Sequence, residues 1–173
     1  MRYIIILSAL FWSVLPAHAE QVFLTPQAYV QAQFDGATPK PKVIWLKQDL
    51  KATMAEILNH DYAGLRVRYW QGEDEQAFKT VWILNEIGKE KNITVGISIH
   101  KQRIEEVKVL VFRESRGWEV KHDFFTRQFK QLFLQDKYRL NKSIDSITGA
   151  TLSARAVEKL ARVALLLDKE VQD

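Results

Sequence analysis

The chain has 173 residues, with 25 lysines and arginines, 21 aspartates and glutamates, 47% hydrophobic residues and no cysteine. This composition is typical of one folded domain, and the lack of cysteine excludes a disulfide scaffold, a thiolate nucleophile, an iron–sulfur cluster and CxxCH haem attachment. Basic and acidic residues are interleaved along the chain, so the net charge of +4 does not indicate nucleic acid as a partner.

The N-terminus has the pattern of a secretory signal peptide at residues 1–19. A basic residue precedes an apolar run over 3–15, and Ala17-His18-Ala19 is a small-x-small cleavage site. A membrane anchor is the alternative, but Pro16 ends the apolar run short of the roughly 20 residues that a spanning helix needs. We therefore expect cleavage after Ala19 and one domain over 20–173. We also expect export to the bacterial periplasm, where disulfides are permitted but not required.

Two short helices are expected in the first third of that domain. Thr25 and Pro26 form a cap followed by a proline at the first helical position, which predicts a helix that runs toward Phe34. A second helix is predicted over 49–58. The turn-rich segment 35–41 between them is too short to indicate a second domain.

Alternating apolar residues predict an antiparallel sheet in the middle of the chain. The alternation is clearest over 93–99, where isoleucine and valine alternate with Thr94, Gly96 and Ser98, so we expect one buried face and one polar or lightly covered face. Further strands are predicted over 65–70, 79–87 and 107–111. Their short connections, at 88–91 and 101–103, allow only antiparallel neighbours, because a parallel crossover needs a dozen or more residues.

Helical spacing returns toward the C-terminus. Asp123 can cap a helix that places four core residues on one face: Phe125, Phe129, Leu132 and Phe133. The last helix has a clearer apolar stripe, made by Leu152, Ala156, Leu160, Val163 and Leu167. The predicted fold class is therefore α+β, with an antiparallel meander flanked by N-terminal helices and a packed C-terminal helix.

The segment that precedes the last helix is Asp145-Ser146-Ile147-Thr148-Gly149-Ala150-Thr151. An ordinary helix entry accounts for such residues, because acids and hydroxyls cap helices and glycine permits a turn. A functional interpretation is also open. The free N–H groups of a helix start favour a phosphate near Thr151 and Ser153, and the small residues Gly149 and Ala150 leave the Thr151 hydroxyl accessible for esterification.

This segment resembles the Asp-x-x-Ser/Thr-Gly-Ala-Thr/Ser flavinylation motif of the FMN-binding domain family, which includes the FMN-carrying subunits of the Rnf complex and of the sodium-translocating NADH:quinone reductase. All specified positions match, namely Asp145, Thr148, Gly149, Ala150 and Thr151. The resemblance implies covalent FMN, carried as a phosphoester on Thr151 and transferred from FAD by an ApbE-type flavin transferase. The other motif residues would serve transferase recognition and shape the phosphate site.

The resemblance extends more loosely to the helix start at Thr25-Pro26, to the strand pair 92–112 and to the glycine-containing loop 114–120. It implies further FMN contacts at Ser153, Glu114, Arg116, Gly117 and Trp118. Trp118 is the first candidate for a wall of the isoalloxazine ring, although ordinary packing is the commoner role of a tryptophan.

The resemblance implies a free-standing periplasmic carrier that passes electrons from a membrane donor to an acceptor such as a multihaem cytochrome or a flavin reductase, with the redox chemistry supplied by the cofactor. The alternative is a non-redox binding or regulatory module that holds flavin without a covalent bond. No metal site or catalytic residue is predicted, because His60, His100 and His122 lack ligand spacing and no GxSxG elbow is present.

Overall fold

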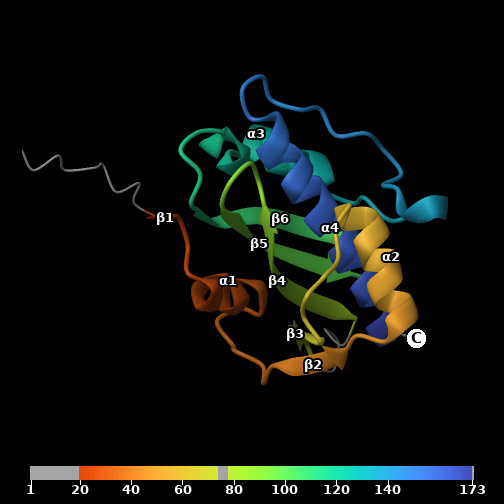
Figure 1. The fold of residues 1–173 in the computed structure, drawn as a ribbon. Coiled ribbons are helices and arrows are strands. Elements are labelled where there is room, and N and C mark those ends of the chain that lie inside the picture. The colour runs from red at the N-terminus through yellow and green to blue at the C-terminus, as the bar shows by residue number, and fades with distance from the viewer. Residues whose placement is uncertain (1–19, 74–77, 173) are drawn as a thin grey trace, which may run out of the picture.

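The computed structural model describes residues 20–73 and 78–172, and the predicted signal peptide lies outside these ranges. The helices and strands, drawn in Figure 1, are β1 (Gln21–Val22), α1 (Pro26–Gln33), β2 (Lys42–Trp45), α2 (Gln48–Leu58), β3 (Arg66–Gln71), β4 (Lys79–Ile87), β5 (Asn92–His100), β6 (Arg103–Phe112), α3 (Asp123–Thr126) and α4 (Thr151–Gln172). Short 3₁₀ helices are η2 (Trp118–Lys121), η3 (Arg127–Phe129) and η4 (Asp136–Tyr138). Within the described ranges, no helix combines the length and the apolar character needed to cross a membrane.

One six-stranded antiparallel sheet, in the order β1-β6-β5-β4-β3-β2, organises the fold. Strands β2 to β6 follow one another as a meander, and α2 is inserted between β2 and β3. The predicted α+β class is thus confirmed. The edge strands β1 and β2 were not predicted, since two and four residues are too few for a period of two to be recognisable.

Helices α2 and α4 cover one face of the sheet and enclose the larger core (Figure 1). The ring of Trp82 is fully buried there and stacks on Tyr69 at 4.8 Å between ring centres. Most of the predicted α4 stripe is buried, but Leu152 is 47% exposed. Ser153 takes the buried position that was predicted for Leu152. It packs against the loop that contains Gly117.

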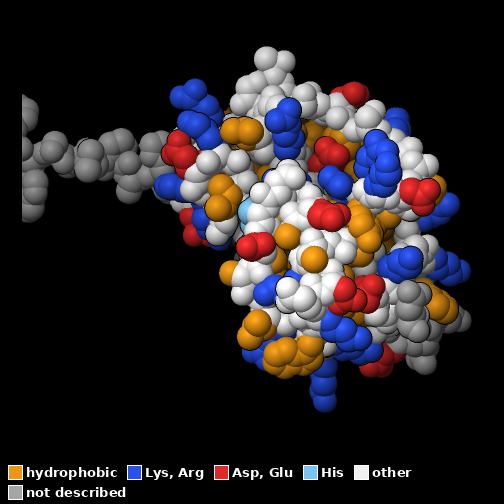
Figure 2. Space-filling model, turned by 45° about the vertical axis from the view of Figure 1, so that its right-hand side comes forward, with side chains coloured by type: hydrophobic (Ala, Val, Ile, Leu, Met, Phe, Trp, Pro, Cys, Tyr) orange, Lys and Arg blue, Asp and Glu red, His pale blue; other side chains and the backbone are white. Residues whose placement is uncertain are grey.

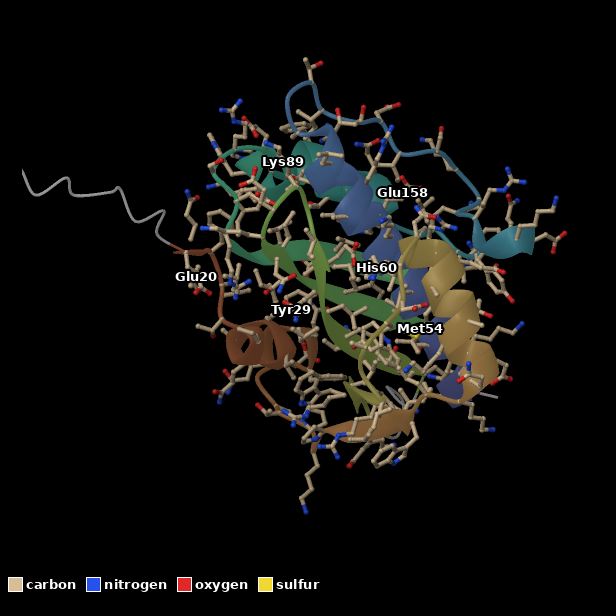
Figure 3. The ribbon with its side chains drawn as sticks, in the orientation of Figure 1. Glu20, Tyr29, Met54, His60, Lys89 and Glu158 are labelled. Atoms are coloured by element: carbon tan, nitrogen blue, oxygen red, sulfur yellow. The ribbon has the colours of Figure 1, made fainter. Side chains whose placement is uncertain are left out.

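The opposite face of β5 is not lightly covered as predicted, because α1 packs on it (Figure 1). Thr25 caps α1 by accepting a hydrogen bond from the Ala28 N–H at 3.2 Å. From α1 the buried ring of Tyr29, labelled in Figure 3, lies so close to Gly96 that a Cβ at this glycine would be 2.5 Å from the ring. The small residues of β5 that suggest exposure therefore make room for an aromatic ring.

The continuous helix predicted after Asp123 is wrong in its length. The structure has only the single turn of α3 followed by the 3₁₀ turn η3. The helix cannot continue because Gln131 has a φ of +65° and its N–H donates to the carbonyl of Ile104 at 2.7 Å. The segment thus pairs with the start of β6 instead of continuing as a helix. Phe125 and Phe129 are core residues as expected, with their rings edge to face at 5.5 Å.

Charged side chains of both signs are spread over the face of the molecule that Figure 2 shows. Hydrophobic side chains form only small groups between them on this face. This distribution agrees with the interleaved charges of the sequence.

Candidate functional site

The loop that carries the matched motif is held at both of its ends. The side chain of Gln128 makes two hydrogen bonds to the backbone of Asp145. Its Oε1 accepts from the Asp145 N–H at 2.9 Å, and its Nε2 donates to the Asp145 carbonyl at 3.4 Å. At the other end a turn closes through the Ala150 N–H, which donates to the carbonyl of Ile147 at 2.9 Å. Gly149, the third residue of this turn, has a φ of +85°, a conformation that glycine adopts without strain.

Helix α4 starts directly after this turn. Its first helical hydrogen bond runs from the Ala154 N–H to the Ala150 carbonyl at 2.9 Å, so Ala150 is the N-cap and Thr151 is the first residue of the helix. The N–H groups of Thr151, Leu152 and Ser153 therefore have no partner within the helix. Such N–H groups, together with the positive end of the helix dipole, favour a negatively charged group.

Thr151 lines a hollow of about 230 Å³ at the start of α4. The other lining residues are Ile144 and Ser146 from the motif loop and Ala154, Arg155 and Glu158 from the helix. Thr151 is half-buried, and its hydroxyl makes no hydrogen bond to any residue that the structure describes. The hydroxyl is therefore uncommitted and stands at an opening of the protein surface.

The rest of the motif is accessible from outside. Asp145, Thr148 and Gly149 are exposed, whereas Ala150 is buried under the helix start. A Cβ built on Gly149 would meet no atom within 4 Å, so the space beside this residue is open. A second protein molecule can therefore reach the motif from solvent.

The glycine loop predicted to contact FMN packs against the motif and the first turn of α4. Gly117 has a φ of +88°, and a Cβ at this position would be 2.7 Å from Ser153 Oγ and 3.5 Å from Ala150 Cα. Gly117 thus permits close packing of the loop against the first turn of α4. Thr151 and Ser153 are separated by about 200° around the helix, so Ser153 faces this loop while Thr151 faces the hollow.

Glu114 anchors the turn between β4 and β5. Its Oε1 accepts hydrogen bonds from three consecutive backbone N–H groups, those of Lys89 at 2.5 Å, Glu90 at 2.7 Å and Lys91 at 2.9 Å. Burial alone would raise the pKa of this carboxyl, but the three N–H donors outweigh it and hold the pKa below its usual range. One carboxylate oxygen is thus committed to the hairpin, and a contact of Glu114 with FMN stays a prediction.

Replacing Glu114 by alanine is expected to lower the free energy of unfolding by about 2 kcal/mol at pH 7, because three backbone donors lose a charged acceptor. The lowered pKa means that this contribution is present above the pKa of the unfolded chain and is lost as the pH falls through the pKa of the folded protein. Urea unfolding at pH 7 and at pH 3 measures both effects. An equal difference between variant and wild type at both pH values would contradict the carboxylate's role.

Trp118 is 40% exposed, so it is not a core residue. It lies edge to face with His122, with 5.4 Å between the ring centres, and His122 stacks on Phe124, which is 51% exposed. The ammonium group of Lys121 lies 4.9 Å from the centre of the Trp118 ring. These residues form an open aromatic group next to Gly117, while Arg116 is exposed on the same loop.

The structure separates the predicted contacts into two sets. Gly117 and Ser153 contact each other on the side of α4 that faces away from the hollow. Trp118, on the same loop as Gly117, does not line the hollow of Thr151 either. Arg155 and Glu158 do line it, and neither was predicted from the sequence. Their distances of four and seven residues from Thr151 are the helical spacing that puts residues on one face, and this spacing could have identified them.

Comparisons with known proteins bear on the domain family and on the fold. Residues 88–166 match the family model described as the FMN-binding domain. The fold is similar to the crystal structure of Shewanella oneidensis NqrC, with a TM-score of 0.61 and 14% sequence identity over 84% of this chain and 95% of that chain. No curated protein sequence matches the chain. The matched residues contain Gly117 and the whole motif that ends at Thr151, so this part of the chain is similar to the FMN-binding domain family.

Proposed function

We propose that this protein is a periplasmic electron carrier that holds FMN as a phosphoester on Thr151. The observation that carries the proposal is the position of the Thr151 hydroxyl, which is uncommitted, borders a hollow and ends a fully matched flavinylation motif at the start of α4. The family match supports FMN as the ligand.

The residues around Thr151 fit the phosphate end of FMN. The free N–H groups of the first turn favour a negative charge, and the open space beside Gly149 leaves room for its approach. When bound, FMN supplies the redox chemistry, and the chain supplies attachment and orientation. The open aromatic group formed by Trp118, His122 and Phe124 is the candidate surface for the isoalloxazine ring.

Attachment to Thr151 requires one phosphoryl transfer from FAD. A bond forms between Thr151 Oγ1 and the phosphorus of the FMN moiety, the pyrophosphate bond of FAD breaks, and AMP leaves. The proton of the threonine hydroxyl passes to a base of the transferase. The exposed side chains of Asp145 and Thr148 support recognition by a separate ApbE-type enzyme, because both are accessible from solvent.

The proposed location follows from the signal peptide expected at residues 1–19. A flavin bound covalently cannot diffuse away outside the cytoplasm, where a lost cofactor is not replaced. We propose a membrane donor and a periplasmic acceptor, either a multihaem cytochrome or a flavin reductase, as the redox partners. Cell fractionation and the mass of the mature N-terminus test the location, with cleavage after Ala19 as the expected result.

The covalent bond is tested by the intact mass of the purified protein, expressed with and without an active flavin transferase. We expect an increase of one FMN minus one water only when the transferase is present, together with flavin fluorescence that survives denaturation. Flavin that copurifies but is lost on denaturation, with the protein mass unchanged, would favour the non-covalent binding module instead.

A further inference from the structure

Arg155 lines the hollow of Thr151 from the same helix, four residues farther along α4. Residues four apart lie on one helical face, with Cβ atoms about 5–6 Å from each other. Ile144 and Ser146 of the motif loop form the other side of this hollow. Arg155 therefore borders the same space as Thr151.

The neighbouring basic residues Lys159 and Arg162 of α4 have structural partners, in contrast to Arg155. Lys159 donates to the Leu58 carbonyl at 2.5 Å and pairs with Glu86 at 3.6 Å, so it ties α4 to α2 and β4. Arg162 donates to the carbonyl of Tyr138 at 2.6 Å. Among the described residues, Arg155 makes neither an ion pair nor a hydrogen bond, and it is exposed. Its charge is thus available for a ligand in the hollow.

We propose that Arg155 binds the phosphodiester that attachment creates at Thr151, an inference that rests on the proposed function. The phosphodiester carries one negative charge on two non-bridging oxygens. A guanidinium group presents paired N–H donors in the planar geometry that such oxygens accept, and charge-assisted hydrogen bonds of this kind are about twice as strong as neutral ones.

Two sets of donors would then hold the phosphodiester. The N–H groups of the first turn of α4 would hold it at the start of the helix, and Arg155 would hold it from one turn farther along the same face. Glu158, one turn farther, carries the opposite charge and keeps the anion at the Thr151 end of the hollow. Arg155 is thus a positioning residue that restricts the motion of the flavin tether.

The test compares wild type with Arg155→Gln, Arg155→Lys and the control Lys169→Gln, which removes the same charge from the last turn of α4. Intact mass first establishes whether each protein carries covalent flavin. For the flavinylated proteins, we expect the fluorescence anisotropy of the flavin to fall in Arg155→Gln, to be partly restored in Arg155→Lys, and to be unchanged in Lys169→Gln. Added salt should lower the wild-type anisotropy toward that of Arg155→Gln, because salt screens an exposed charge pair.

A second measurement uses the proteins without attached flavin and free FMN as the probe. We expect Arg155→Gln to weaken the binding of free FMN about tenfold and Lys169→Gln to leave it unchanged. Equal anisotropy and equal FMN affinity in Arg155→Gln and wild type would overturn the inference, as would equal losses in the control. A wild-type protein that binds free FMN through Arg155 but gains no mass with the transferase would refute attachment at Thr151 and leave the anion site standing. Absence of both attached and bound flavin would overturn both.

Discussion

Replacing Thr151 by alanine is expected to remove all covalent flavin and to leave the fold intact. The hydroxyl oxygen is the atom that would form the ester bond, so its loss removes the attachment point. The same hydroxyl makes no hydrogen bond within the described part of the chain, and Ala150, not Thr151, occupies the N-cap position of α4. We expect the free energy of unfolding to change by less than about 0.5 kcal/mol.

Intact mass and in-gel flavin fluorescence after denaturation measure this effect, with the transferase present in all samples. Thr151→Ser should retain the flavin, because it keeps a hydroxyl at the same helix position. Ser146→Ala is the matched control, since Ser146 lines the same hollow and the variant removes a different hydroxyl. Covalent flavin in Thr151→Ala would refute the attachment site, and its loss in Ser146→Ala would show that the hollow matters more than the single hydroxyl.

A buried carboxyl far from Thr151 is expected to make the stability of the protein depend on pH. Asp168, near the end of α4, is fully buried. Its two carboxylate oxygens accept hydrogen bonds from Thr80 Oγ1 and Gln102 Nε2, each at 2.5 Å. Burial nevertheless raises the pKa of Asp168 from 3.8 to about 6, against the opposing effect of these donors.

The direction of the pH effect follows from this raised pKa. Between pH 4 and pH 6 the folded protein binds a proton more tightly than the unfolded chain does, so the free energy of unfolding falls as the pH rises through this window. Above pH 6 Asp168 is charged in the folded protein, and the full cost of burying this charge lowers the free energy of unfolding. A rise of the pKa from 3.8 to about 6 corresponds to about 3 kcal/mol.

Asp168→Asn is therefore expected to raise the free energy of unfolding at pH 8 by up to about 3 kcal/mol. The new amide can still accept from Thr80, and it can donate to Gln102 once that side chain turns its oxygen inward. Urea unfolding from pH 4 to pH 8 checks the prediction, which also requires a flatter pH dependence in the variant. Asp136→Asn is the control, because it removes one charge from an exposed position. A variant less stable than wild type at pH 8 would contradict a net burial penalty.

The amino-acid sequence by itself determined the features that depend on local patterns. The alternation of apolar residues identified β3 and β5, and the cap and proline at Thr25 and Pro26 marked the start of α1. The motif that ends at Thr151 was located at the start of the last helix for the same reason, since turn and capping residues act over a few neighbouring positions.

Tertiary structure alone decided which residues meet across the chain. The packing of Tyr29 on Gly96 covers a strand face that looks polar in the sequence, and the pairing of Gln131 with Ile104 ends a helix that its own apolar spacing favours. The contact of Gly117 with Ser153 joins segments that no local pattern relates. These outcomes depend on packing between distant segments, which overrides local propensity because most of the stability of short elements comes from tertiary contacts.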